Sequence, residues 1–260
     1  MIRRRKKKRD KRRRGIYILP NLFTTASLFS GFYSIISAIG GHYYTAAVAI
    51  LISCVFDMLD GRIARLTRTT SRFGLEYDSL SDLVAFGVAP AILAFLWALQ
   101  PYRRLGWLAA FLYVATCALR LARFNTQVNN IDSRYFNGLP CPSAAALVAT
   151  SVLLHHELSG STGTFQHPGV LIMIYILSYL MVSTVPYHSL KSSQLFQKKP
   201  FHVLVAAILL IMVIAMEPHI TLFILTALYV ASGPVLFVAL YRRRKAEKLL
   251  AEQGQTHQAG

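Results

Sequence analysis

Four aspartates between two long apolar runs are the residues of this sequence best suited to chemistry. They are Asp57, Asp60, Asp78 and Asp82, in the stretch DMLDGRIARLTRTTSRFGLEYDSLSD. Asp57 and Asp60 are three residues apart, and Asp78 and Asp82 are four apart, so on helices each pair lies on one face. The polar segment TRTTS between the pairs can turn the chain so that the two faces meet. We therefore expect all four carboxylates to point into one site.

Carboxylates gathered at the edge of a membrane repel one another unless a cation neutralises them. Hard divalent ions such as Mg²⁺ or Mn²⁺ take oxygen ligands, and two of them can share bridging carboxylates. A site with two such ions indicates phosphate chemistry. One alternative is structural, with the aspartates in ion pairs with the nearby arginines Arg62, Arg65, Arg68 and Arg72.

A second alternative is a divalent-cation transporter or sensor, which belongs to another class of protein. Transporters place acidic residues at mid-membrane on several helices. Here the acids lie together where one apolar run ends and the next begins, which favours chemistry at the membrane surface over ion passage.

The composition predicts an all-α, polytopic membrane protein. Of the 260 residues 54% are hydrophobic and only 15% are charged, which is too apolar for an ordinary soluble domain. A membrane-spanning helix needs about 20 apolar residues. Eight windows approach that length: 17–39, 43–65, 79–99, 105–124, 143–158, 169–187, 201–216 and 218–241.

The distribution of basic residues predicts which side of the membrane each loop faces. With eight spans and both termini in the cytoplasm, only Arg103 and Arg104 of the 28 lysines and arginines fall on the far side. We therefore expect a protein of the cytoplasmic membrane with its active site facing the cytoplasm. The basic start MIRRRKKKRDKRRRG suits contact with anionic lipid. A nucleic-acid-binding arm is the alternative, but no other nucleic-acid-binding module follows it. The predicted parts are a basic segment, 1–15, a transmembrane domain, 16–241, and a C-terminal tail, 242–260.

The cysteines and tryptophans are interpreted as structural residues. Cys54, Cys117 and Cys141 have no metal-ligand spacing, so we expect them to be small packing residues. Trp97 and Trp107 flank the outer turn around Pro101, where interfacial aromatic residues are expected.

The aspartate stretch resembles the signature of the CDP-alcohol phosphotransferases in full. The matching positions are Asp57, Asp60, Gly61, Ala64, Arg65, Gly74, Asp78 and Asp82. The resemblance implies that Asp57, Asp60 and Asp78 bind two divalent ions, with Asp82 as a further ligand and the general base. It also implies that Gly61, Ala64 and Gly74 line a CDP site and that Arg65 helps to hold the nucleotide. Asn21 and Thr24, in a segment similar to the family's entry helix, are further candidates for nucleotide contact.

Three more segments resemble the phosphatidylserine synthase branch of that family. They are LRLARFN at 119–125, YFNGLPCPSAAA at 135–146 and VPYHSLK at 185–191. The resemblance implies transfer of a phosphatidyl group from CDP-diacylglycerol to the hydroxyl of L-serine, with release of CMP. Other acceptors (glycerol phosphate, inositol phosphate or choline) and an archaeal-type lipid donor are the alternatives within the family.

A serine pocket needs cationic groups for the carboxylate of the amino acid. Arg120 and Arg123 share a face at the inner end of a predicted span, and an arginine can bind a carboxylate through two hydrogen bonds. Asn125, Asn137 and Lys191 are further polar candidates. The structural alternative is that the two arginines only satisfy the positive-inside rule or bind lipid phosphate. The family resemblance also implies a homodimer formed through membrane helices.

Overall fold

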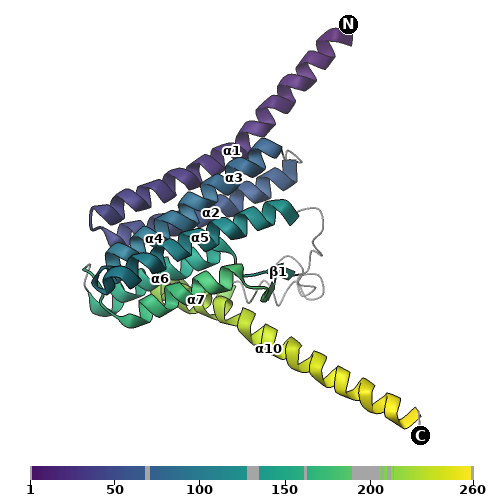
Figure 1. Ribbon diagram of the computed structural model, residues 1–260. Coiled ribbons are helices and arrows are strands. Elements are labelled where there is room, and N and C mark those ends of the chain that lie inside the picture. Colours follow the sequence, from purple (N-terminus) through teal and green to yellow (C-terminus); the bar gives the residue numbers. More distant parts are fainter. Residues whose placement is uncertain are drawn as a thin grey trace.

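The computed structural model is a bundle of helices that lie roughly side by side, with a short pair of β-strands near one end (Figure 1). The residues that it describes are 2–67, 71–127, 135–160, 163–188, 205, 208–209, 212 and 214–258. The predicted helical class is confirmed.

The described part of the chain consists of helices, π-helical and 3₁₀ segments and two short strands. In order they are α1 (Ile2–Ile39), α2 (Tyr43–Thr67), α3 (Arg72–Asp82), the π-helical η1 (Leu83–Val88), α4 (Ala89–Ala94), the π-helical η2 (Phe95–Leu99), the 3₁₀ turn η3 (Gln100–Tyr102), α5 (Arg103–Gln127), β1 (Tyr135–Asn137), α6 (Cys141–Ser159), α7 (Pro168–Val182), β2 (Pro186–His188) and α10 (Pro218–Gln258).

Three stretches of described helix are long and apolar enough to cross a membrane. They are Pro20–Ile39, Arg72–Thr126 and Pro218–Val238. The second of these stretches includes the segments η1, η2 and η3. Six of the eight predicted windows coincide with helical segments up to Val182, and the last coincides with α10. The window 201–216 lies largely outside the described residues, so eight spans remains a prediction.

A row of serines fixes α1 against α2. Ser27, Ser30 and Ser34 recur every three or four residues on the buried face of α1. The Ser27 and Ser53 hydroxyls lie 2.8 Å apart, and those of Ser30 and Ser34 donate to the carbonyls of Ala49 and Ala46, each at 2.8 Å. Small polar residues of this kind let membrane helices approach closely and bond across the interface. These contacts of Ser27, Ser30 and Ser34 form a serine seam between the two helices, and the seam leads toward Asp57 and Asp60 near the end of α2.

The helix that carries the other two aspartates is held against α1 by a small-residue contact. A Cβ atom added to Gly31 would lie 2.6 Å from Cα of Ala85, so the two backbones meet with no room for a larger side chain. Ala85 belongs to η1, which follows directly on Asp82. Pro90 lacks an amide hydrogen and so cannot donate to a carbonyl one turn back, which fits the change in helical winding there.

A small β-ladder was not expected from the sequence. Strands β1 and β2 are antiparallel, with Phe136 opposite Tyr187. Just after β1, Gly138 has a φ of +82°, and a Cβ there would lie 2.5 Å from the carbonyl oxygen of Met181. The amides of Gly138 and Leu139 donate to Val185 and Leu180 at 2.9 and 3.0 Å. These bonds fix the start of α6 to the end of α7.

The last helix packs onto the same end of the bundle through an aromatic residue. The Tyr187 hydroxyl donates to the carbonyl of Val230 at 3.1 Å, and its ring lies so close to Gly233 that a Cβ there would be 2.2 Å away. Beyond this contact α10 continues to Gln258, through the predicted C-terminal tail. The first part of α1, which holds the predicted basic segment, likewise extends away from the bundle (Figure 1).

Candidate phosphotransfer site

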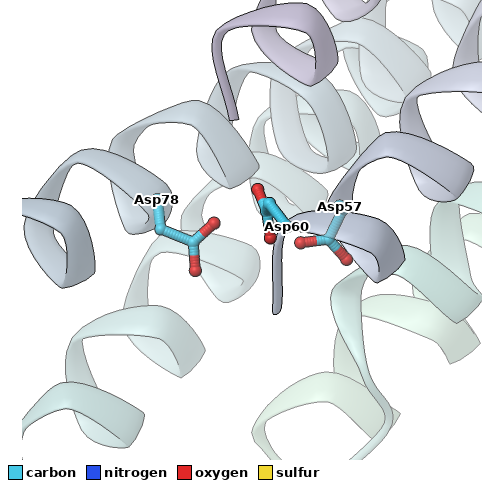
Figure 2. Close-up of side chains that lie close together, drawn as sticks. All are labelled: Asp57, Asp60 and Asp78. Carbon is cyan, nitrogen blue, oxygen red and sulfur yellow. The ribbon is translucent and has the colours of Figure 1, made fainter. Parts of the chain in front are cut away.

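Three of the four predicted aspartates meet at one point. One carboxylate oxygen from each of Asp57, Asp60 and Asp78 lies within 4.8 Å of the others. Figure 2 shows Asp78 projecting from one helix toward Asp57 and Asp60 on another. The approach of α3 to α2 therefore brings together pairs that are far apart in sequence.

Asp82 lies beside this cluster, one helical turn along α3 from Asp78. Its carboxyl group is close enough to those of Asp57, Asp60 and Asp78 for their charges to interact. It is not one of the three residues whose oxygens converge within 4.8 Å. That position suits a group that acts on a molecule bound at the cluster.

The aspartate cluster fits a hard cation. Its donor atoms are all carboxylate oxygens, the ligands that Mg²⁺ and Mn²⁺ prefer. The structural alternative requires basic partners, yet no described lysine, arginine or histidine forms an ion pair with these aspartates. Arg62 and Arg72 are exposed, and the side chains of Arg65 and Arg68 lie outside the described part of the chain. Among the described residues, no basic side chain balances the negative charge of the cluster, and a bound cation would neutralise it.

A pocket of about 320 Å³ opens beside the cluster, and Asp60 and Asp78 form part of its wall. Such a volume is at the lower end of the range for small-molecule sites. Five residues predicted to contact the nucleotide line it: Asn21, Thr24, Gly61, Ala64 and Gly74. The remaining lining residues are Pro20, Ser71, Leu75 and Phe124. The sixth nucleotide candidate, Arg65, lies on α2, but its side chain is not described.

Thr24 makes a contact that the sequence did not predict. Its hydroxyl lies 2.9 Å from Oδ2 of Asp60 and 3.2 Å from the carbonyl oxygen of Pro20, and both residues of the pair are buried. A hydrogen bond to a carboxylate restricts its orientation and so supports any ion that it binds. Thr24 therefore lines the pocket and also orients an aspartate.

The start of α3 forms the opposite wall of the pocket. Ser71 caps this helix, and its hydroxyl accepts a hydrogen bond from the amide of Gly74 at 2.9 Å. A Cβ at Gly74 would lie 3.1 Å from that hydroxyl and 3.4 Å from Oδ1 of Asn21. The hydroxyls of Tyr77 and Thr25 lie 2.9 Å apart and join α3 to α1. Gly74 thus keeps space open beside Asn21.

Of the predicted serine-binding residues, Arg120 has the most suggestive surroundings. Its Nε is buried and has no hydrogen-bond partner among the described residues, although Nη1 donates to Sγ of Cys141 at 3.9 Å. Its side chain is only partly buried, and no ion pair joins it to a described carboxylate. Buried donors are rarely left unpaired, so this atom is available to an anionic ligand.

The other serine candidates are less favoured or lie outside the described part. Asn125 donates to Ser79 at 3.0 Å and to Glu76 at 3.5 Å, so its amide already links α5 to α3. Arg123 is half-buried on α5 without a described ionic partner. Asn137 lies in β1 with its side chain not described, and Lys191 is outside the described residues.

The helical bundle thus places a cluster of carboxylates beside a small-molecule pocket at one end. The sequence model described as CDP-alcohol phosphatidyltransferase matches residues 17–185. The chain belongs to this family. The matched region includes the aspartates, the pocket and Arg120, and α10 lies beyond it.

Several curated proteins are similar to the chain over most of their length. A CDP-diacylglycerol–serine O-phosphatidyltransferase of Helicobacter pylori is 43% identical over 179 residues, covering 68% of this chain and 74% of that protein. The protein of the same name from another strain of that species is 37% identical over 228 residues, covering 86% and 93%. An archaetidylserine synthase of Methanothermobacter thermautotrophicus is 34% identical over 180 residues, covering 68% and 72%.

Proposed function

We propose that this protein transfers the phosphatidyl group of CDP-diacylglycerol to the hydroxyl of L-serine and releases CMP. The observation that carries the proposal is the position of the Asp57, Asp60 and Asp78 carboxylates beside a pocket lined by Asn21 and Gly74. Family membership defines the reaction class. The named relatives differ in lipid, since one is an archaetidylserine synthase, but they share serine. Serine is therefore the acceptor best supported.

The nucleotide end of the donor would occupy the 320 Å³ pocket. Asn21 and Thr24 on α1, Gly61 and Ala64 on α2, and Gly74 on α3 border this space. The small size of Gly61, Ala64 and Gly74 lets a ligand approach the helix backbones closely. Leu75 and Phe124 add an apolar portion to the wall, on which the less polar parts of the donor can pack.

Asp57, Asp60 and Asp78 would hold two divalent ions, Mg²⁺ or Mn²⁺, with Asp82 as a further ligand. When bound, such ions neutralise the pyrophosphate and stabilise negative charge as it develops on the departing CMP. Thr24 holds Asp60 in one orientation for this purpose. Arg65, at the end of α2, would reach the nucleotide.

Asp82 would accept the proton from the serine hydroxyl. The serine oxygen then forms a bond to the lipid-side phosphorus, and the bond from that phosphorus to the oxygen of CMP breaks. Arg120, and less directly Arg123, Asn125, Asn137 and Lys191, are the residues that would hold the acceptor. Among them Arg120, whose Nε has no hydrogen-bond partner among the described residues, is the residue most suited to a carboxylate.

The membrane arrangement completes the proposal. The charge distribution favours a protein of the cytoplasmic membrane, with both termini and the site facing the cytoplasm. We expect a homodimer, which cross-linking in native membranes would test.

A direct assay tests the function. Purified protein is given CDP-diacylglycerol with Mg²⁺ or Mn²⁺ and one labelled acceptor: serine, glycerol phosphate, inositol phosphate or choline. We expect CMP and labelled lipid only with serine, and loss of both products with EDTA. Equal CMP release without serine would contradict the acceptor, whereas cation transport without any CMP release would favour the transporter alternative.

A further inference from the structure

Arg120 contacts a buried thiol whose role the reaction outlined above does not explain. Cys141, the first residue of α6, lies between Arg120 and Cys117 of α5. Both cysteines are fully buried and neither forms a disulfide. The sequence suggested that these residues only fill space, but their polar contacts are specific.

The thiol of Cys141 is bonded on two sides. It accepts a hydrogen bond from Nη1 of Arg120 at 3.9 Å, and it donates to the backbone carbonyl of Cys117, also at 3.9 Å. A thiol is a weak donor and a weak acceptor, so each bond is modest alone. Together they fix one end of the guanidinium relative to α5 and α6.

The position of the thiol is itself fixed by the backbone around it. Pro140 and Pro142 flank Cys141, and the two preceding amides, those of Gly138 and Leu139, are bonded to the region at the end of α7. The Pro142 carbonyl accepts a hydrogen bond from the thiol of Cys54 on α2 at 3.8 Å. The segment therefore cannot move away from Arg120 without breaking contacts to three other helices.

We propose that Cys141 is a positioning residue for the acceptor, because it holds Nη1 of Arg120 so that the edge carrying Nε faces the carboxylate of serine. The inference rests on the proposed function. A guanidinium binds a carboxylate best through two parallel N–H groups on one edge. Cys141 occupies Nη1, which belongs to the other end of the fork, and Nε has no described partner. The side chains of Cys141 and Asp82 also lie near enough to interact, which places this cluster on the side of the proposed base.

Steady-state kinetics of Cys141→Ala test this role. Serine is compared with serinol, which keeps the hydroxyl and the ammonium group but has no carboxylate. Since a hydrogen bond contributes about 0.5–1.5 kcal/mol, we expect the KM for serine to rise about threefold to tenfold. The KM for CDP-diacylglycerol and the rate with serinol should stay unchanged. Cys141→Ser, which keeps a polar acceptor, should recover part of the affinity for serine.

Cys54→Ala is the matched control. It removes a thiol of α2 that donates to the Pro142 carbonyl at the start of α6 and is not bonded to Arg120. We expect its KM for serine to equal that of the wild type. An unchanged KM for serine in Cys141→Ala, or equal losses with serine and serinol, would overturn the role of Cys141.

A double variant separates positioning from packing. In an Arg120→Lys background the planar edge is absent, so adding Cys141→Ala should raise the KM for serine no further. A further rise equal to that of the single variant would contradict the proposal. If the wild type itself releases CMP without serine, the proposed function fails and the role of Cys141 fails with it. If the wild type requires serine but Cys141→Ala has the same KM for serine as the wild type, only the positioning role is refuted.

Discussion

The hydroxyl of Thr24 lies 2.9 Å from Oδ2 of Asp60, joining α1 to α2 at the wall of the pocket. This bond links the residue predicted to contact the nucleotide with one of the three converging carboxylates. The pocket and the carboxylate cluster therefore form one structural unit, and a change on α1 should alter both.

Thr24→Val should weaken metal-dependent activity. Valine keeps the shape of threonine but cannot donate to Asp60. Loss of a hydrogen bond to a metal ligand typically reduces metal affinity or activity about 10–100-fold. We expect the Mg²⁺ or Mn²⁺ concentration for half-maximal activity to rise and excess ion to restore part of the rate. Thr25→Val, which removes a hydroxyl bonded to Tyr77 instead, is the control and should leave the metal requirement nearly unchanged.

Asp82→Asn should separate turnover from binding. The amide cannot accept a proton, and loss of a general base typically costs about 10²–10⁴-fold in rate. Binding of labelled CDP-diacylglycerol, measured at equilibrium, should stay close to that of the wild type. Glu76→Gln, on the exposed side of the same helix, should retain most of the activity. Near-normal turnover in Asp82→Asn would show that another group takes the proton.

Gly74→Ala should impair the donor site alone. The new methyl group would lie 3.1 Å from the Ser71 hydroxyl and 3.4 Å from Oδ1 of Asn21, so it narrows the pocket. A methylene-sized change in a binding pocket is worth about 1–3 kcal/mol, and we expect the KM for CDP-diacylglycerol to rise about tenfold. The KM for serine should not change. Gly40→Ala, remote from the pocket, serves as control, and a matching rise there would point to a general loss of structure.

Ser34→Leu should destabilise the bundle. Ser34 is fully buried, and its hydroxyl donates to the carbonyl of Ala46. Leucine removes this bond and adds volume between two close helices, and overpacking costs about 1–3 kcal/mol in the free energy of unfolding. A lower apparent Tm in detergent is the expected readout. Phe29→Leu, on the exposed face of α1, should leave the Tm unchanged. An equal fall in both variants would contradict a specific stabilising role of the serine seam.

The spacing of the aspartates was enough to predict the convergence of Asp57, Asp60 and Asp78, whereas Asp82 lies beside them and not among them. A separation of three or four residues defines a helix face, and the polar turn between the pairs allows the two faces to meet. The small residues Gly61, Ala64 and Gly74 were expected at the ligand, and all three line the pocket. Metal binding and nucleotide binding by these residues remain predictions.

Hydrogen bonds between residues of different helices could not be predicted from the sequence. Thr24 and Asp60 are 36 positions apart, and no periodic pattern relates them. Asn125 is bonded to Ser79 because α5 passes close to α3, which the polarity of its side chain does not reveal. Trp97 was expected at the outer membrane surface, like Trp107, but only 2% of it is exposed. The rings of Trp97 and Phe165 stack with centroids 5.5 Å apart.

The serine seam between α1 and α2 implies an uneven tolerance to mutation. Ser30 and Ser34 bond to backbone carbonyls of α2, which every residue type supplies. Substitutions at Ala49 and Ala46 therefore leave the acceptors in place and are limited only by volume. At Ser30 and Ser34 the hydroxyl itself is required, so small residues should replace Ala46 and Ala49 more easily than they replace these two serines.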